Sequence, residues 1–158
     1  MLRYINGGTP IPREEIEREI LPRFLAYHER GPNEGFFAAV EKSSGRFVGW
    51  FHLRPAREDP RPGETELGYR LRRDAWSKGY ATEGSRALIR KAFEELGWRR
   101  VIARTMAVNM RSRRVMERCA MELVRTWYAP WPDPMEGAEH GDVEYAIDRE
   151  EWERSPGQ

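Results

Sequence analysis

The chain has 158 residues, a length typical of one domain, so a single core must carry any chemistry. Its charges nearly cancel, with 27 Lys+Arg against 26 Asp+Glu, whereas a dedicated nucleic-acid binder normally carries a clear basic excess. No apolar run approaches the roughly 20 residues that a membrane-spanning helix needs. The single cysteine, Cys119, excludes an internal disulfide, and no Cys/His cluster suggests zinc. The composition predicts a cytoplasmic protein with no metal, membrane or nucleic-acid partner.

The pattern of the first third of the chain predicts one helix and two strands. The helix is expected over residues 9–28, with Thr9 as its N-cap, because apolar residues recur along one side. Pro22 is expected to kink this helix or to end it early. Residues 36–41 and 47–54 are rich in aromatic side chains and are separated by a short turn containing Ser and Gly, which predicts a hairpin.

A third strand is expected over residues 64–71. Successive side chains of a strand point to opposite faces, so Glu66 and Arg70 share one face, and Tyr69 and Leu71 share the other.

The second half of the chain is predicted to contain two helices and three strands. The expected elements are a long helix over 81–96, a strand over 100–108, a short helix after Asn109, and strands over 122–129 and 143–148. Gly97 stands where a left-handed helix C-cap is expected, and Asn109 is a typical N-cap. An early hairpin followed by strands that alternate with helices favours an α+β fold with a mixed sheet.

The segment Trp76-Ser-Lys-Gly-Tyr-Ala-Thr-Glu83 joins a strand to the start of the long helix. Its small residues let a ligand approach the backbone, and the free N–H groups of a helix start favour an anion such as phosphate. Lys78 and Arg73 add positive charge at the same end. The alternative is a turn that merely connects two elements. The spacing fits neither the Rossmann fingerprint nor a P-loop.

A second segment, 104–123, combines a strand, a short helix capped by Asn109, and another strand. Asn109 and Ser112 are also compatible with an ordinary helix start. Basic residues cluster in both segments: Arg70, Arg72, Arg73 and Lys78 in one, and Arg111, Arg113, Arg114 and Arg118 in the other. They form either two solvated faces or two walls of a site for a small polyanion.

Three motifs together give the chain a specific resemblance: Glu66-Leu-Gly-Tyr-Arg-Leu71, Trp76-Ser-Lys-Gly-Tyr-Ala-Thr-Glu-Gly84 and Asn109-Met-Arg-Ser-Arg-Arg-Val-Met-Glu-Arg-Cys-Ala-Met121. In order and register, they resemble the acetyl-CoA-dependent GNAT N-acetyltransferases of the ribosomal-protein alanine-acetyltransferase-like (RimJ/RimL-type) branch. The resemblance implies an α+β GNAT fold, in which helices flank a mostly antiparallel central sheet with one splayed pair of strands. It also implies transfer of an acetyl group from acetyl-CoA to a primary amine, on a protein N-terminus or a small molecule.

The resemblance assigns a cofactor role to residues in all three motifs. The pyrophosphate is expected on the loop before the long helix, with pantetheine pairing like an extra strand beside the third strand and Asn109 holding its amide. Arg113 is expected towards the nucleotide end. The implied cofactor-binding residues are Tyr69, Leu71, Arg73, Lys78, Gly79, Tyr80, Ala81, Thr82, Asn109, Ser112 and Arg113.

The resemblance also assigns catalytic roles. Glu66, beside the expected thioester, is the candidate to take the proton of the amine, directly or through water; the alternative is an exposed strand glutamate. Ser112 is the candidate to protonate or hydrogen-bond the leaving thiolate, and Tyr128 is a second possibility. Positioning of the two reactants contributes much of the remaining rate.

Three further residues are candidates for the acceptor site. His52 lines the acceptor pocket or is simply a packed strand residue, and His140 approaches the acceptor or belongs to a loop turn. Trp127, with Tyr128 and Trp131, walls the acceptor site or seals the edge of the sheet.

The chain departs from the family pattern in three places. Trp76 replaces a Gln or Arg, and Cys119-Ala120-Met121 replaces a small-Gly-Phe sequence, which is expected to reshape the turn after the short helix. Residues 1–158 are expected to form a single GNAT domain that lacks the family's first strand and helix, so either the start is truncated or a partner chain, such as a second copy in a homodimer, completes the sheet. The competing functions are a GNAT enzyme that uses a longer acyl-CoA and a non-catalytic acyl-CoA-binding or dimerising module.

Overall fold

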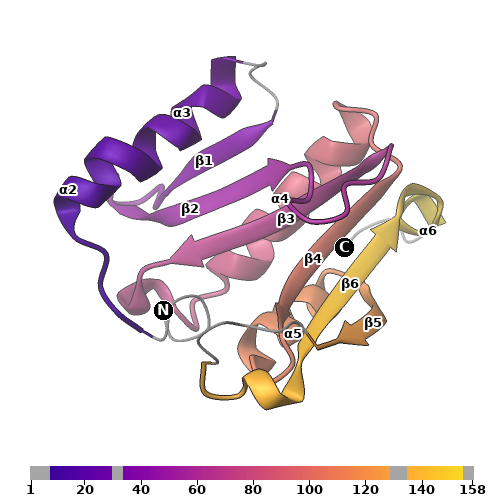
Figure 1. Ribbon diagram of the computed structural model, residues 1–158. Coiled ribbons are helices and arrows are strands. Elements are labelled where there is room, and N and C mark those ends of the chain that lie inside the picture. Colours follow the sequence, from indigo (N-terminus) through magenta and orange to yellow (C-terminus); the bar gives the residue numbers. More distant parts are fainter. Residues whose placement is uncertain (1–7, 30–33, 129–134, 155–158) are drawn as a thin grey trace.

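The structure, a computed structural model, describes residues 8–29, 34–128 and 135–154. Within these residues, six strands form one mixed sheet in the order β1-β2-β3-β4-β6-β5 (Figure 1). The strands are β1 (Gly35–Val40), β2 (Phe47–Arg54), β3 (Glu64–Leu71), β4 (Arg100–Met106), β5 (Glu122–Trp127) and β6 (Asp142–Asp148). Neighbouring strands are antiparallel except for β3 and β4, which run parallel. The predicted α+β fold with a mostly antiparallel sheet is confirmed.

The strand positions follow the prediction closely in the first half and less closely in the second. β2 and β3 have the expected bounds, and β1 begins and ends one residue early. β4 stops at Met106 because Ala107 and Val108 form the turn that leads into the next helix. β5 ends at Trp127.

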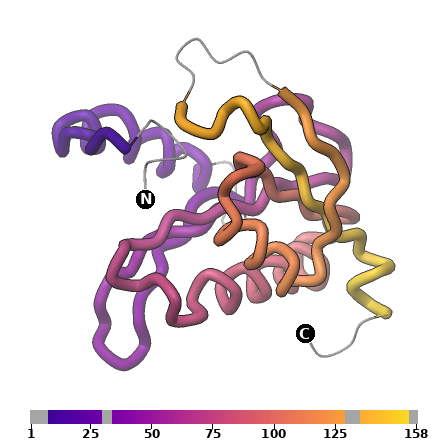
Figure 2. Tube along the Cα trace, turned by 90° about the horizontal axis from the view of Figure 1, so that it is seen from below, coloured from indigo at the N-terminus to yellow at the C-terminus, as the bar shows by residue number. Residues whose placement is uncertain are grey.

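Helices lie on both faces of the sheet (Figure 2). The N-terminal helix consists of α2 (Arg13–Glu15), η1 (Ile16–Ile20) and α3 (Leu21–Glu29), and the two later helices are α4 (Tyr80–Glu94) and α5 (Met110–Arg118). The neighbouring residues Trp50 and Phe51 of β2 show the two faces. Trp50 contacts Phe24 of α3, whereas the ring of Phe51 lies against Gly84 of α4.

Pro22 distorts the N-terminal helix but does not end it. The residues just before it, Ile16–Ile20, form a π-helical turn, and the helix then continues to Glu29. Proline has no N–H to donate to the carbonyl four residues earlier, and widened turns of this kind accommodate such an interruption. The helix starts at Arg13 with Pro12 in the N-cap position, so Thr9 is not its cap.

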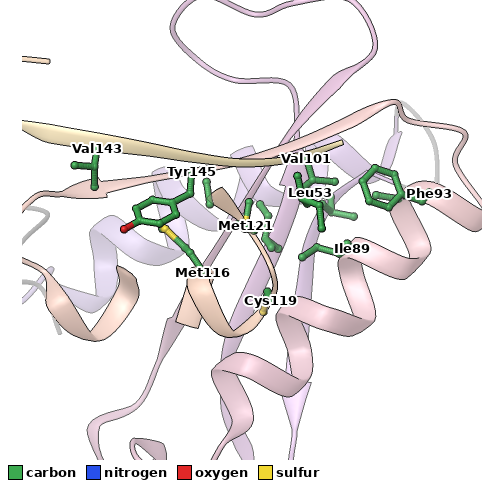
Figure 3. Packing of buried hydrophobic residues seen from close by; sticks show 13 residues of the cluster. Leu53, Ile89, Phe93, Val101, Met116, Cys119, Met121, Val143 and Tyr145 are labelled. Atoms are coloured by element: carbon green, nitrogen blue, oxygen red, sulfur yellow. The ribbon is translucent and has the colours of Figure 1, made fainter. Parts of the chain in front are cut away.

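The main core lies between the sheet and the helices α4 and α5 (Figure 3). Leu53 of β2, Val101 of β4 and Phe93 of α4 are fully buried there. The apolar stripe predicted for the long helix is confirmed by the burial of Ile89, Ala92 and Phe93. Gly97 has φ +71°, as expected for a left-handed residue after a helix.

Three short elements of the described structure were not predicted from the sequence. They are η2 (Arg73–Ala75), η3 (Ala138–His140) and α6 (Arg149–Arg154). In α6, Trp152 packs on Phe93 with ring centroids 5.4 Å apart, and the rest of the helix is polar. One aromatic residue in a six-residue segment gives no helical period to detect.

The turn after α5 keeps a left-handed residue although glycine is missing from it. Ala120 has φ +58°, and the amides of Ala120 and Met121 bond to the carbonyls of Glu117 and Met116 at 3.0 and 3.1 Å. These bonds close the helix end in the way glycine usually permits. The turn therefore closes with a strained left-handed residue at Ala120, and its reshaping relative to the family by Cys119-Ala120-Met121 stays a prediction.

Replacing Ala120 with glycine is expected to stabilise the chain. The left-handed conformation costs an L-residue roughly 1–2 kcal/mol, but glycine also gains freedom in the unfolded chain, which leaves a net gain of about 0.5–1 kcal/mol. Urea unfolding of the Ala120→Gly variant measures this gain. Ala87→Gly, at an exposed position inside α4, should instead lose about 1 kcal/mol, and a loss in both variants would contradict the strain argument.

Candidate active site

The site lies where β3 and β4 part. Their parallel register covers three residue pairs, the last of which is Glu66↔Ile102. Beyond Glu66, β3 continues to Leu71 with pairing to β2 alone, while β4 continues with pairing to β6. The edge of β3 that faces β4 is thus available for strand addition, and Glu66 stands at the start of the opening.

The loop before α4 has the properties of an anion site. Gly79 occupies the N-cap position with φ +83°, and a Cβ atom there would meet nothing within 4 Å. The first helical backbone bond runs from the Glu83 amide to the Gly79 carbonyl, so the preceding amides have no helical acceptor. Lys78 and Arg73 are exposed beside this turn.

Two residues fix the loop in place. The indole Nε1 of Trp76 donates to the Leu71 carbonyl at 3.0 Å, and the Tyr80 hydroxyl donates to Glu41 at the end of the β1–β2 hairpin. The guanidinium of Arg111, on α5, lies 5.1 Å from the centre of the Trp76 ring. This contact places one arginine of the second basic segment beside the loop, and the choice between two solvated faces and a two-walled anion site stays open.

Ser112 lies next to a tyrosine, but that tyrosine is Tyr69 of β3. The Tyr69 hydroxyl donates to the Ser112 oxygen at 3.4 Å, and burial raises the pKa of Tyr69, so its phenol keeps its proton. Tyr128, the second predicted proton donor, is 72% exposed at the end of β5. The pairing of Tyr69 with Ser112 was missed because their numbers differ by 43 and only the fold joins them.

Asn109 and Arg113 are both engaged within the protein. The Asn109 side chain accepts from the Ser112 amide at 3.4 Å and donates to the Thr105 hydroxyl at 2.9 Å, so the predicted cap is confirmed. Arg113 donates to the Tyr145 hydroxyl at 3.0 Å and to the Ala107 carbonyl at 3.1 Å. These bonds give Arg113 a role in tying α5 to the sheet, and its role towards the nucleotide stays a prediction.

Glu66 forms a polar cluster with two residues of β2. Its carboxylate lies 3.3 Å from Arg54 and 3.7 Å from the Nε2 atom of His52. Burial raises the pKa of Glu66, but His52 and Arg54 outweigh burial and leave it below the ordinary value. Glu66 is therefore an ionised carboxylate and a weaker base than an ordinary glutamate.

His52 is a buried, uncharged ring. Burial lowers its pKa, against the opposing influence of Glu66, and neither ring nitrogen has a hydrogen-bond partner in the described residues. The ring sits directly over Gly68, where a Cβ atom would come within 2.3 Å of it, and beside Phe36 and Trp50. These contacts make His52 a packed strand residue beside Glu66, and its role in lining an acceptor pocket stays a prediction.

The other acceptor candidates lie in two places. The Cζ atoms of Arg104 and Arg125 lie over the Trp127 ring, 5.8 and 5.1 Å from its centre, so the ring packs at the β5 edge of the sheet. The His140 side chain is exposed and lies 3.5 Å from Glu139, as in the loop-turn reading. Trp131 lies outside the described residues. Of these candidates, His52 is the one that the structure brings to Glu66.

Two arginines near the candidate site, Arg54 and Arg104, were not predicted as site residues. Arg54 pairs with Glu66 across β2 and β3, and Arg104 bonds to buried Glu144 at 2.7 Å. The pairing of Arg54 with Glu66 could have been found from the register of β2 and β3, but that register depends on the turn between the two strands.

In the described ranges, no group of three His, Cys, Asp or Glu side chains is placed to hold a metal, and no helix has the length and hydropathy to cross a bilayer.

Comparison with known proteins identifies the family. The acetyltransferase (GNAT) domain profile matches residues 1–122, which is most of the chain. The chain therefore belongs to the GNAT acetyltransferase family, and its six-stranded mixed sheet flanked by helices is the GNAT fold. The match does not single out the RimJ/RimL-type branch, which stays a prediction.

One curated relative is the FsC-acetyl coenzyme A-N(2)-transacetylase of Aspergillus fumigatus, which is 45% identical over 125 residues. The aligned part covers 76% of this chain but 53% of the relative, so the chain spans about half the length of that protein. Its name describes a transfer from acetyl-CoA to nitrogen.

Two solved structures show the same fold at low identity. A GNAT-family acetyltransferase from Bacillus anthracis has a TM-score of 0.73 and 22% identity, covering 94% of this chain and 81% of that one. The aminoglycoside acetyltransferase AAC(6')-Ib in complex with coenzyme A has a TM-score of 0.74 and 19% identity, covering 99% and 86%.

Proposed function

We propose that residues 1–158 form one acetyltransferase domain that moves the acetyl group of acetyl-CoA to a primary amine by direct attack. The observation that carries the proposal is the position of Glu66 at the last residue pair before β3 and β4 part. An opening for strand addition, an anion site at the start of α4 and a carboxylate at the junction are the three parts this reaction needs. The family match and the name of the fungal relative support the same activity.

In the proposed reaction, the amine nitrogen attacks the thioester carbonyl, and the carbon–sulfur bond breaks to release CoA thiolate. The attacking amine must lose a proton, and Glu66 with neutral His52 beside it supplies the acceptor, directly or through water. Ser112 donates a hydrogen bond to the thiolate, or passes it a proton that the serine then regains from water. The Tyr69 hydroxyl, by donating to the Ser112 oxygen, leaves the proton of Ser112 free to point elsewhere.

The direct test mixes the protein with acetyl-CoA and a panel of amines, and measures the release of free thiol. The only cysteine of the chain, Cys119, is buried and its pKa is raised to about 11, so it adds little background. Release with at least one amine supports the proposal. Tight binding of acetyl-CoA without release across the panel would identify a non-catalytic acyl-CoA-binding module, and preference for a longer acyl-CoA would change the acyl donor.

Replacing Ser112 with alanine is expected to lower turnover by about 100-fold while leaving the Kd for acetyl-CoA within about threefold, because proton transfer acts on the transition state. Steady-state kinetics and calorimetry measure the two quantities. Ser43→Ala, in the exposed β1–β2 turn, is the matched control and should change neither. Unaltered turnover in Ser112→Ala would leave Tyr128 or water as the donor.

A further inference from the structure

Arg70 lies on the same face of β3 as Glu66, with Gly68 between them. The antiparallel register with β2 places Arg54 opposite Glu66, His52 opposite Gly68 and Trp50 opposite Arg70. The His52 ring covers Gly68, so this face carries a row of Glu66, His52 and Arg70 side chains. The row begins where β3 and β4 part and follows the length of β3 that pairs with β2 but not with β4.

The Arg70 guanidinium is partly buried and has no ionic partner among residues 8–29, 34–128 and 135–154. Its Nε atom is out of contact with water and has no acceptor, and no carboxylate among the described residues pairs with it. Burial lowers the pKa of Arg70, with no neighbouring charge to oppose the effect. Other arginines near this face, such as Arg54 and Arg104, have carboxylate partners. Burying a charge without a partner is costly, so an unpaired guanidinium here calls for an explanation.

The Arg70 guanidinium lies over the Trp50 ring. The Arg70 Cζ atom lies 5.3 Å from the centre of the Trp50 ring. The enclosed Nε atom leaves the two terminal nitrogens of Arg70 to meet a ligand, and their N–H groups match a carboxylate in a two-bond arrangement. The Trp50 ring is itself held by edge contacts with Phe24 and Phe36 at 5.2 and 5.3 Å, so the platform is rigid.

The distance between Glu66 and Arg70 sets the distance expected between the amine and the acidic group of a ligand. Glu66 and Arg70 are four residues apart on one strand, which separates their Cα atoms by about 13 Å. Their side chains are long enough to shorten this gap. An acceptor whose amine meets Glu66 and whose acidic group meets Arg70 would lay its middle part along His52 and Trp50.

We propose that Arg70 binds an acidic group of the acceptor, so that the substrates of this site are amines that also carry a carboxylate. The inference rests on the proposed function and adds the substrate class to it. Arg70 contacts the substrate and sets specificity, while Glu66 remains the residue at the reacting amine.

The test uses matched probes that differ in one charge. The acids 4-aminobutanoate, 6-aminohexanoate and 8-aminooctanoate are compared with their carboxamides, in thiol-release kinetics and in calorimetric binding to CoA-loaded protein. We expect the wild-type chain to prefer at least one acid to its amide by about tenfold, the usual range for a charge-assisted hydrogen bond. Arg70→Gln should remove this preference, and Arg70→Lys should keep part of it.

Arg90→Gln, at an exposed position on α4, is the matched control and should keep the full preference for acids. Three results would overturn the inference: no acid preference in the wild type, an equal loss for acids and amides in Arg70→Gln, or a weaker Kd for acetyl-CoA in that variant. If the proposed function itself is wrong, no probe will release thiol from acetyl-CoA, and this result differs from all three results above. The binding preference in CoA-loaded protein still decides the role of Arg70 in that case.

Discussion

Replacing Gly79 with glutamate is expected to abolish acetyl-CoA binding while the chain stays folded. The side chain would enter open space, because nothing lies within 4 Å of a Cβ atom at this position. Its carboxylate would then occupy the start of α4, where the free amides and the helix dipole favour a negative group. A built-in anion competes with the pyrophosphate and repels it, so we expect the Kd to rise by at least about 100-fold, a cost of roughly 3 kcal/mol.

Gly79→Gln is the matched control for this effect. Glutamine has nearly the same size and suffers the same left-handed strain, about 1–2 kcal/mol at φ +83°, but it carries no charge. Calorimetry should show a modest loss of affinity for acetyl-CoA in Gly79→Gln and no detectable binding in Gly79→Glu. Circular dichroism should show that both variants are folded. Equal affinities of the wild type and Gly79→Glu for acetyl-CoA would contradict the assignment of the pyrophosphate to this loop.

The second large effect is expected in stability. Glu144 of β6 is 1% exposed and receives bonds from Arg104 at 2.7 Å and Arg125 at 2.9 Å. Replacing it with glutamine leaves both guanidiniums without their counter-charge, and Arg104 is itself largely buried. Breaking a buried pair in this way costs about 3–5 kcal/mol, and we expect the lower end because Arg125 reaches solvent. Urea unfolding at neutral pH measures the loss.

The pH dependence of this loss follows from the charge of Glu144. Burial raises its pKa, but the bonds from Arg125 and Arg104 outweigh burial and place the pKa below the usual 4.5. The ion pairs therefore stabilise the fold fully above about pH 4.5, and this contribution is lost as the pH falls through the lowered value. The difference between wild type and Glu144→Gln should shrink in that acid range. Glu122→Gln, at an exposed position of β5, should show no comparable loss, and a similar loss there would contradict the burial argument.

Local chemistry made much of the fold predictable. The hairpin turn, the Gly97 cap and the Asn109 cap each depend on a few neighbouring residues, and all three are present. The π-turn before Pro22 was harder to foresee, because proline forbids one hydrogen bond without dictating how the helix absorbs the loss. The helix α6 carries one apolar anchor, Trp152, and therefore has no sequence period.

The candidate site was predictable where a motif supplies the backbone and unpredictable where the sheet brings side chains together. The loop around Gly79 follows from its own residues. The contacts of His52 with Glu66, of Tyr69 with Ser112 and of Arg111 with Trp76 each join distant segments, so they depend on strand register and helix placement. No spacing rule along the chain contains that information.

The short junction between β3 and β4 has a consequence for how the protein folds. β1, β2 and β3 are consecutive hairpin partners, and β4 and β6 pair with each other along their full lengths, so each half of the sheet is well paired within itself. The two halves join through three residue pairs at Glu64–Glu66 together with the helices. Because closing long loops slows folding, we expect each half to form before this seam. Glu66 belongs to the seam, so partly folded chains would have no assembled site, and activity would appear only when both halves have docked.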